Sequence, residues 1–334
     1  MKVLHLPYGI GMSALSLALR GQGIDATSCS LKEHHYDYMA DIRIRFDRAS
    51  AYKNDQTRQA FFMACLDQYD IFHFHFGETF LPDKSDLNIL KQHGKKMVMH
   101  HRGSEVRLLT KAQSFNNPYV RVKPSWPEHK IKKNLKLLST YIDHAIVADH
   151  ELLPYVEPYY KHVHVVPYAI DAGQYKLNYP SADSIPLIVH APSNQDIKGT
   201  RHVIQAVERL RGEHVPFIFK LIHKIPHTEA IQLYEQATII VDQLLIGTYA
   251  NLSMEAMSMG KPVICYVRED LRSKFPPSLP IVSATPDTIY AVLKDLIATP
   301  NRWAPLGIQG RQYVEQQHSM EKVAKSLIQI YRRL

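Results

Sequence analysis

Short apolar runs alternate with longer amphipathic stretches along the whole chain. In the first half, the apolar runs predicted to be strands are Val3–Leu6, Ile71–Phe74, Lys96–Met99, Ala145–Val147 and Val163–Val166. The amphipathic stretches predicted to be helices are Met12–Arg20, Thr57–Gln68, Asp86–His93 and Ile131–Thr140. This alternation is typical of a parallel sheet whose strands are connected by crossover helices.

The alternation stops at Ala172–Pro186, which has few large apolar residues, and then restarts. The predicted strands of the second half are Leu187–His190, Phe217–Ile222, Ile239–Val241, Val263–Tyr266 and Ile281–Val282. The predicted helices are His202–Arg211, His227–Gln236, Leu252–Met259 and Pro286–Ala298, and a closing amphipathic helix covers Ser319–Arg332.

These patterns predict an α/β chain with two doubly wound, Rossmann-like parallel-sheet domains. The expected domains are residues 1–175 and 185–315, and residues 316–334 are expected to form a helix that packs back on the first domain. A length of 334 residues fits two domains of ordinary size.

Composition narrows the class of protein. With 45% hydrophobic and 22% charged residues, the chain has enough apolar surface to fold, and its net charge of +8 favours an anionic partner. Cys29, Cys65 and Cys265 lie far apart without a CxxC pair, which favours a reducing cytosol over a disulfide framework. Apolar runs are too short to span a bilayer, and Pro7–Gly11 interrupts the apolar N-terminal stretch, unlike in a signal peptide. We therefore expect a cytoplasmic protein, with peripheral membrane contact left open.

The segment from Ile239 to Ile264 carries the most specific chemistry. A buried strand ends at Asp242, a loop follows, and a helix opens near Asn251 with Glu255 one turn inside it. A helix N-terminus at the carboxyl end of a parallel strand is an anion site, and a carboxylate one turn inside can accept hydrogen bonds from ribose hydroxyls. The alternative is that Glu255 only complements the helix dipole.

This segment resembles the donor-binding motif of retaining GT-B glycosyltransferases of family 4, and Glu255–Ile264 match its second half. The resemblance implies a GT-B fold with two domains facing a cleft. It also implies that Glu255 holds the ribose of a nucleotide sugar, and that the N–H groups of Ala250, Asn251 and Leu252 hold its diphosphate. The first Glu of the family motif falls at Gly247, where this sequence departs from the pattern.

A second match lies at the start of the second half. Ile188–Thr200 resemble the family's strand, loop and Lys-Gly segment, in which an Arg and a Lys neutralise the departing diphosphate. The resemblance assigns the lysine to Lys198, but Ser193 stands where the arginine is expected. A lone lysine before glycine is otherwise a common surface charge at the start of a helix.

The first half carries the expected acceptor side. Gly9 and Gly11 follow the first strand, where glycine lets the backbone approach a ligand, and the absence of a full GxGxxG argues against a nicotinamide cofactor. Met99–Arg107 resemble a family segment with a histidine before the glycine. In this sequence Arg102 directly precedes the glycine, so His101 is the first choice for a histidine facing the cleft and His100 is the alternative.

Two histidines, His73 and His75, share one face of a predicted strand because alternate residues of a strand point the same way. An HxH pair can bind a metal, but no local carboxylate or cysteine completes a set. We therefore expect no metal site, with His75 on the acceptor side or both rings as structural core residues.

The basic residues are not concentrated in either half of the chain, and the nearest thing to a basic patch is a run of lysines at the start of one predicted helix. Lys130, Lys132, Lys133 and Lys136 either form a solvated helix face or contact a membrane surface or an anionic acceptor. No motif for nucleic-acid binding is present, so no nucleic-acid partner is expected.

The sequence thus predicts a metal-independent hexosyltransferase without a cofactor, which uses a nucleotide sugar (UDP-sugar as first choice) with retention. Lys198 would stabilise the leaving diphosphate, and His101 or Arg102 would contact the transferred sugar. The acceptor, whether glycan, lipid-linked or small molecule, is open. The alternatives are a non-catalytic GT-B subunit that binds a glycan or a partner, favoured by Ser193 and Gly247, and a nucleotide-sugar epimerase.

Overall fold

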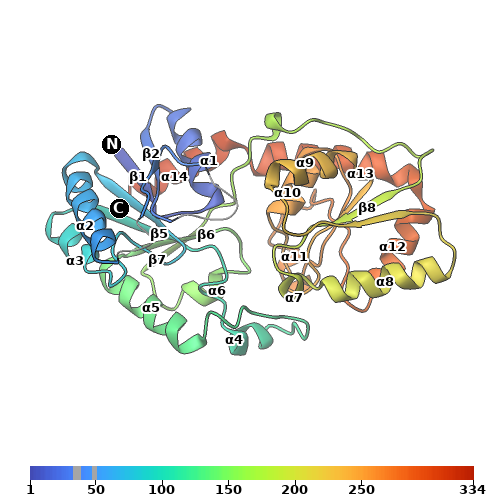
Figure 1. Cartoon of the computed structure of the whole chain (residues 1–334), viewed down its shortest axis with the longest axis horizontal. Coiled ribbons are helices and arrows are strands. Elements are labelled where there is room, and N and C mark those ends of the chain that lie inside the picture. Colours follow the sequence, from blue (N-terminus) through green and yellow to red (C-terminus); the bar gives the residue numbers. More distant parts are fainter. Residues whose placement is uncertain (33–38, 47–50) are drawn as a thin grey trace. The chain divides into compact units, whose positions relative to one another are not determined.

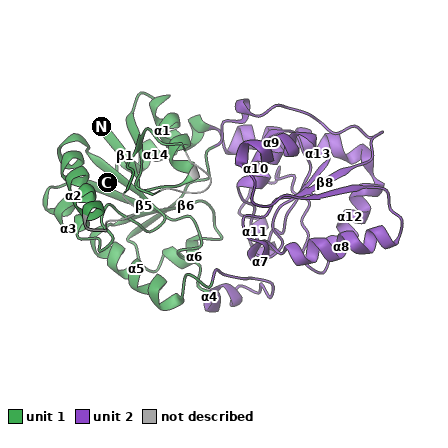
Figure 2. Ribbon diagram, viewed as in Figure 1, with its two compact units in different colours: residues 1–108, 124–169, 320–334 green, residues 109–123, 170–319 purple. Residues whose placement is uncertain are grey.

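The computed structural model describes residues 1–32, 39–46 and 51–334 of the chain. The chain divides into two compact units (Figure 2). Unit 1 comprises residues 1–108, 124–169 and 320–334, and unit 2 comprises residues 109–123 and 170–319.

Unit 1 is built on a parallel sheet in which seven strands lie within the described residues, in the order β3-β2-β1-β4-β5-β6-β7 (Figure 1). The strands are β1 (Lys2–Leu6), β2 (Asp25–Ser30), β3 (Ile42–Arg43), β4 (Ile71–His75), β5 (Lys96–His100), β6 (His144–Val147) and β7 (His162–Val165). The helices are α1 (Ile10–Arg20), α2 (Ala51–Gln68), α3 (Asp86–Gln92), α5 (Glu128–Tyr141), α6 (Leu153–Val156) and α14 (Met320–Tyr331).

Strand alternation divides the sheet of unit 1 into two buried faces. On one face, apolar residues of β1, β4, β5 and β6 pack against α1 and α14, which lie side by side in Figure 1. On the other face, Phe72 of β4 contacts Phe80, which contacts Phe62 of α2. Helix α14 therefore belongs to the core of unit 1, although it follows the whole of unit 2 in the sequence.

Unit 2 has a parallel sheet with four strands among its described residues, in the order β11-β10-β8-β9. They are β8 (Leu187–His190), β9 (Ile218–Leu221), β10 (Ile239–Val241) and β11 (Val263–Ile264). The helices are α4 (Leu109–Gln113), α7 (Gln195–Lys198), α8 (Thr200–Gly212), α9 (His227–Gln236), α10 (Asn251–Ser258), α11 (Glu269–Arg272), α12 (Ile289–Ala298) and α13 (Trp303–Gln317), with 3₁₀ turns at Ala172–Gln174 and Pro300–Arg302. Its core joins this sheet to α8, α12 and Trp303.

The predicted parallel α/β architecture is confirmed, with local differences. Strands β2 and β3 and helix α13 were not predicted, and Ile281–Val282 form only an isolated bridge from Val282 to Ile264. Two segments, residues 109–123 and 170–175, join unit 2, although they were expected in the first domain.

Residues 109–123 contact unit 2 through Asn117, whose side chain donates to the carbonyls of Leu245 and Ile246.

The chain passes from unit 1 to unit 2 at residue 169, rather than between residues 175 and 185. The segment after this point is bound to unit 2 by hydrogen bonds. The N–H of Ile170 donates to the carbonyl of His318, and the N–H of Asn178 donates to the carbonyl of Met259. These bonds fix to unit 2 a stretch that has few large apolar residues and that interrupts the alternation of the predicted elements.

Candidate functional site

Asp242 organises the end of β10 and the beginning of α10. Its buried carboxylate accepts hydrogen bonds from the Ser253 hydroxyl at 2.7 Å and from the Ala250 N–H at 3.3 Å. Ala250, the residue that precedes α10, makes no side-chain cap of its own. Asp242, directly after β10, therefore supplies the carboxylate that holds the first turn of the helix.

This arrangement changes which backbone groups remain for a ligand. Of the three N–H groups expected to bind a diphosphate, that of Ala250 is already bonded to Asp242. The N–H groups of Asn251 and Leu252 lie in the first turn, where a helix offers no internal acceptor. These two donors and the positive end of the helix dipole are the groups that the first turn of α10 can offer to an anion.

Lys198 ends α7 and reaches the same edge of the sheet. Its Nζ lies 2.7 Å from Oε1 of Gln243 and 3.4 Å from Oδ1 of Asp242, and its side chain is mostly buried. The next residue, Gly199, has φ +80°, and a Cβ at this position would lie 3.1 Å from Leu245. Gly199 thus lets the chain turn tightly against the loop after β10. The sequence motif did not predict Gln243 as a partner of Lys198.

Ser193 lies in the exposed part of the loop after β8. Its neighbour Asn194 caps α7 by accepting a hydrogen bond from the N–H of Ile197 at 3.0 Å. The loop brings no cation to the position where the resemblance expects an arginine, so Lys198 is the cation that the predicted site residues of unit 2 contribute.

The structure gives a physical reason for glycine at position 247. Its φ is +94°, and a Cβ there would lie 2.5 Å from Cγ of Arg268. The N–H of Arg268 donates to the carbonyl of Gly247 at 2.9 Å, and its guanidinium pairs with Asp270 at 2.7 Å. Arg268 therefore covers the backbone of the loop where the family motif places a glutamate side chain.

Glu255 is almost fully buried on α10, and its Oε1 lies 2.9 Å from Nε2 of His227 at the start of α9. This hydrogen bond to the carboxylate raises the pKa of His227 above its ordinary value of 6.5. Sequence reasoning missed His227 because it lies on another helix. The pairing gives Glu255 a partner in the ligand-free protein, and a ribose would have to share or replace that partner.

The glycine loop of unit 1 fits closely under an arginine. Gly9 precedes α1 with φ +140°, and a Cβ on Gly11 would lie 2.6 Å from Nη2 of Arg102. The same nitrogen lies 3.2 Å from Nδ1 of His75, and the guanidinium lies over the ring of Tyr168. Arg102 is only partly buried, whereas the side chains of His75 and His101 are fully buried.

His101 faces the interior of unit 1. Its side chain is fully buried, Nε2 lies 3.0 Å from the hydroxyl of Tyr160, and Nδ1 lies 3.5 Å from Oε1 of Glu105. Glu105 also accepts hydrogen bonds from the N–H groups of Arg102 and Gly103. His101 is therefore an interior residue that contacts Glu105, the side chain that binds the backbone of the turn at Arg102 and Gly103. The prediction that His101 faces a cleft does not agree with this burial.

His75 is also fully buried, and it belongs to a group of four histidines on one face of the sheet. The others are His73 of β4, His5 of β1 and His100 of β5. Burial lowers the pKa of all four rings, that of His5 to about 3, so they are neutral. Sequence reasoning paired His73 with His75 but missed His5, which lies in another strand.

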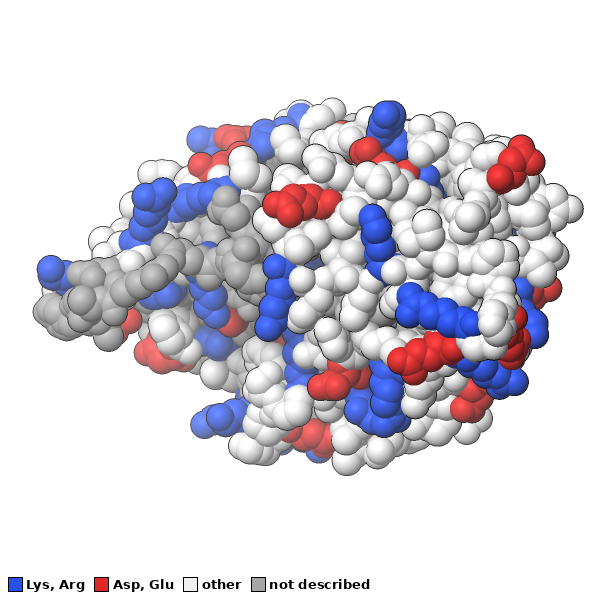
Figure 3. All heavy atoms as spheres, turned by 45° about the vertical axis from the view of Figure 1, so that its right-hand side comes forward, with Lys and Arg blue, Asp and Glu red and all other residues white. Residues whose placement is uncertain are grey.

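The lysine run lies on α5. Ile131, Leu135 and Leu138 are buried, whereas Lys130, Lys132, Lys133 and Lys136 are all exposed. Lys132 pairs with Glu128 at 3.5 Å. On the face of the molecule that Figure 3 shows, basic and acidic side chains are interspersed. None of the helices in the described part of the chain has both the length and the apolar character required to cross a membrane.

Comparison with known proteins gives matches in structure alone. No protein-family model matches the sequence, and no curated protein matches it. A sucrose-phosphate synthase from Thermosynechococcus elongatus is similar over 100% of this chain and 99% of its own, with TM-score 0.66 and 15% identity. HepE of Anabaena, in complex with UDP-glucose, is similar over 100% of both chains, with TM-score 0.68 and 12% identity.

A glycosyltransferase from Rickettsia africae is similar over 99% of this chain and 97% of its own, with TM-score 0.64 and 12% identity. These neighbours share the GT-B architecture, and the similarity extends over both units. The chain therefore has the GT-B fold.

Proposed function

We propose that the chain is a glycosyltransferase that moves a sugar from a nucleoside-diphosphate sugar to an acceptor with retention of configuration. The observation that carries the proposal is the edge of the unit 2 sheet. Lys198, the first turn of α10 and the buried carboxylate of Glu255 lie there, within a segment resembling family 4 of the GT-B glycosyltransferases. A UDP-sugar is the first choice of donor, since HepE of Anabaena binds UDP-glucose.

Each group has a distinct task in this proposal. Glu255 accepts hydrogen bonds from the ribose hydroxyls, and the N–H groups of Asn251 and Leu252 hold the diphosphate. Lys198 stabilises the negative charge that develops as the diphosphate leaves, which is an electrostatic task that needs no metal. Gln243 and Asp242 keep the ammonium group in position.

Unit 1 would hold the acceptor. Gly9 and Gly11 would form the acceptor side of this loop, and Arg102, which lies against Gly11, would contact an acceptor hydroxyl or the transferred sugar. His75 and His101 would support this surface from inside the unit. The exposed lysines of α5 offer a contact for a membrane surface or an anionic acceptor, with the protein acting at the cytoplasmic side.

Binding of nucleotides tests the donor site. We expect calorimetry to detect binding of at least one of UDP, GDP and ADP. Glu255→Ala should weaken it about 10- to 150-fold, because a hydrogen bond to a charged group contributes about 1.5–3 kcal/mol. Glu229→Ala removes an exposed carboxylate of the neighbouring helix α9 and should leave the affinity unchanged. The proposal fails if none of the three nucleotides binds at millimolar concentration.

Turnover tests the chemistry separately from binding. Mass spectrometry after incubation with a panel of nucleotide sugars and cell-extract acceptors should detect a glycosylated product. Lys198→Met should slow its formation more than it weakens nucleotide binding, whereas Lys220→Met, at an exposed position of β9, should have no effect.

The principal alternative is a non-catalytic subunit that binds a glycan or a partner. It is favoured by the lack of an acid at Gly247 and of a cation at Ser193. Nucleotide binding without product from any donor would support this alternative. Release of an altered nucleotide sugar without an acceptor would indicate an epimerase.

A further inference from the structure

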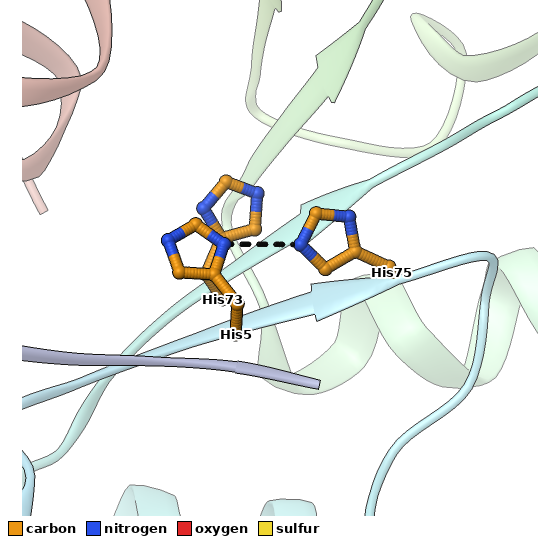
Figure 4. Close-up of side chains that lie close together, drawn as sticks. All are labelled: His5, His73 and His75. Carbon is orange, nitrogen blue, oxygen red and sulfur yellow. Dashed lines mark hydrogen bonds between the residues drawn. The ribbon is translucent and has the colours of Figure 1, made fainter. Parts of the chain in front are cut away.

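The sheet of unit 1 places three histidines next to one another. His5 of β1 and His73 of β4 are paired residues of neighbouring parallel strands. His75 follows two positions after His73 and so points to the same face. The three rings converge from two rigid strands, as Figure 4 shows.

The three ring systems are close enough to share one ion. One nitrogen from each ring can be chosen so that all three lie within 4.8 Å of one another, and all three side chains are fully buried. Nδ1 of His5 lies 3.1 Å from Nε2 of His75. Two imidazole nitrogens bound to one tetrahedral Zn²⁺, at about 2.0–2.1 Å each, are separated by about 3.3 Å. The first two ligands are therefore already near the required separation.

We propose that His5, His73 and His75 bind one divalent transition-metal ion, with Zn²⁺ as the first choice. Each ring supplies one nitrogen, and the fourth position is left for a water molecule. Imidazole ligands suit Zn²⁺, Ni²⁺ and Cu²⁺, whereas Mg²⁺ and Ca²⁺ require oxygen ligands, which this triad does not offer. The inference is independent of the proposed function, because the site lies in unit 1 and takes no part in stabilising the diphosphate on unit 2.

His73 also has the outer partners that metal-binding histidines need. The Tyr331 hydroxyl lies 2.6 Å from Nδ1 of His73, and Nδ1 of His100 lies 3.2 Å from its Nε2. Whichever nitrogen binds the ion, the other retains a hydrogen-bond partner that fixes the orientation of the ring.

Arg102 is the charged group that contacts the triad within the described chain. An arginine only donates hydrogen bonds, so Nδ1 of His75 accepts from it, and the proton of His75 is on Nε2, facing His5. An ion at Nε2 requires this proton to move to Nδ1 and Arg102 to leave that nitrogen. Arg102 therefore competes with the ion, both by its contact and by its charge.

The experiment measures zinc in the purified full-length protein. Protein expressed with added Zn²⁺ and dialysed without chelator should contain about one Zn²⁺ per chain by elemental analysis. Zinc added back to the chelator-treated protein should raise its thermal midpoint. His5→Ala and His73→Gln should each lower zinc affinity more than 100-fold, beyond the roughly 10–100-fold lost when an outer-shell partner is removed.

A matched control addresses binding at the surface. His144 lies 3.1 Å from His164 on the neighbouring strands β6 and β7 and is partly exposed. His144→Ala should retain the full zinc content, and Arg102→Gln should bind zinc more tightly than the wild type. Co²⁺ in the wild type should give the strong visible absorption of a four-coordinate nitrogen-bound ion.

The proposal is overturned if the folded wild type holds no zinc, or if zinc is lost in His144→Ala but kept in His5→Ala. Weaker binding by Arg102→Gln would also contradict the assigned position of the ion. Should His5→Ala fail to fold, the Co²⁺ spectrum of the wild type decides, because a six-coordinate spectrum excludes the triad as the site.

Discussion

Replacing Gly247 by alanine tests whether the loop after β10 has room for any side chain. The methyl group would lie 2.5 Å from Cγ of Arg268, in a backbone conformation with φ +94°. The left-handed backbone costs about 1–2 kcal/mol, and overpacking costs about 1–3 kcal/mol. Alanine also lowers the conformational entropy of the unfolded chain, which stabilises the folded state by about 0.4–1 kcal/mol. The free energy of unfolding of unit 2 should therefore fall by about 1–5 kcal/mol.

Fluorescence can report this loss from unit 2 alone. The two tryptophans of the chain are Trp126 in unit 1 and Trp303, buried in unit 2. In a Trp126→Phe background, urea unfolding followed by the emission of Trp303 gives the stability of unit 2 with and without Gly247→Ala.

Two further variants separate the backbone cost from the contact. Arg268→Ala removes the side chain that the new methyl group meets, so the double variant should be more stable than the sum of the single changes by about 0.5–3 kcal/mol. Gly23→Ala measures the backbone cost alone, because Gly23 has φ +76° with nothing within 4 Å of a Cβ. Gly23 lies in unit 1, so its variant is followed by the emission of Trp126 in a chain that retains that tryptophan. A loss below about 0.5 kcal/mol for Gly247→Ala would refute the reasoning, because it would match an ordinary surface substitution.

Three more outcomes follow from the buried polar contacts. Affinity for UDP should rise as the pH increases above 6.5, because protonated His227 holds Glu255 until its raised pKa is passed, and His227→Ala should abolish this dependence in calorimetry. Asp242→Asn should lower the free energy of unfolding by about 1–3 kcal/mol in urea titration. Tyr331→Phe should cost about 1–3 kcal/mol in the same assay, because Nδ1 of His73 loses its partner.

The pH test also has a consequence for stability. Because the pKa of His227 is raised in the folded state, its contact with Glu255 stabilises the protein below pH 6.5, and this stabilisation is lost as the pH rises through the raised value. Ligand-free stability and UDP affinity should therefore change in opposite directions. A parallel change would contradict competition for Glu255.

Asp183→Asn, in an exposed loop, is the control for Asp242→Asn and should leave the free energy of unfolding unchanged.

The central strands of both sheets could be predicted because they are short, apolar and buried. The elements that were missed lack this pattern for physical reasons. Strand β2, Asp25–Ser30, is mostly polar, although its pairing with β1 buries part of it. Helix α13 contains Gly307, and a Cβ there would lie 2.0 Å from the carbonyl oxygen of Gly260. Close packing against the end of α10 thus requires glycine, which weakens the helical signal in the sequence.

The candidate sites differ in the same way. Asp242, the loop and Glu255 belong to one continuous strand–loop–helix segment, so spacing along the chain was enough to predict that segment and its order of elements. His227, Gln243 and Arg268 contribute only through side-chain contacts, and no spacing rule predicts those. The histidine cluster of unit 1 joins residues as distant as His5 and Tyr331 through strand pairing and the return of α14. Only the folded chain reveals it.

The two departures from the family motif therefore have different physical meanings. Ser193 is exposed in a loop whose geometry depends on Asn194, so nothing in the loop excludes a longer side chain at 193. Gly247 is enclosed by Arg268 in a conformation that disfavours any side chain. Arg268 and the glycine form a mutually dependent pair, because the arginine occupies the space that a glutamate would need. The absence of an acid at 247 is thus built into the packing of unit 2, and in the proposed function the donor would have to be recognised by the remaining groups around α10.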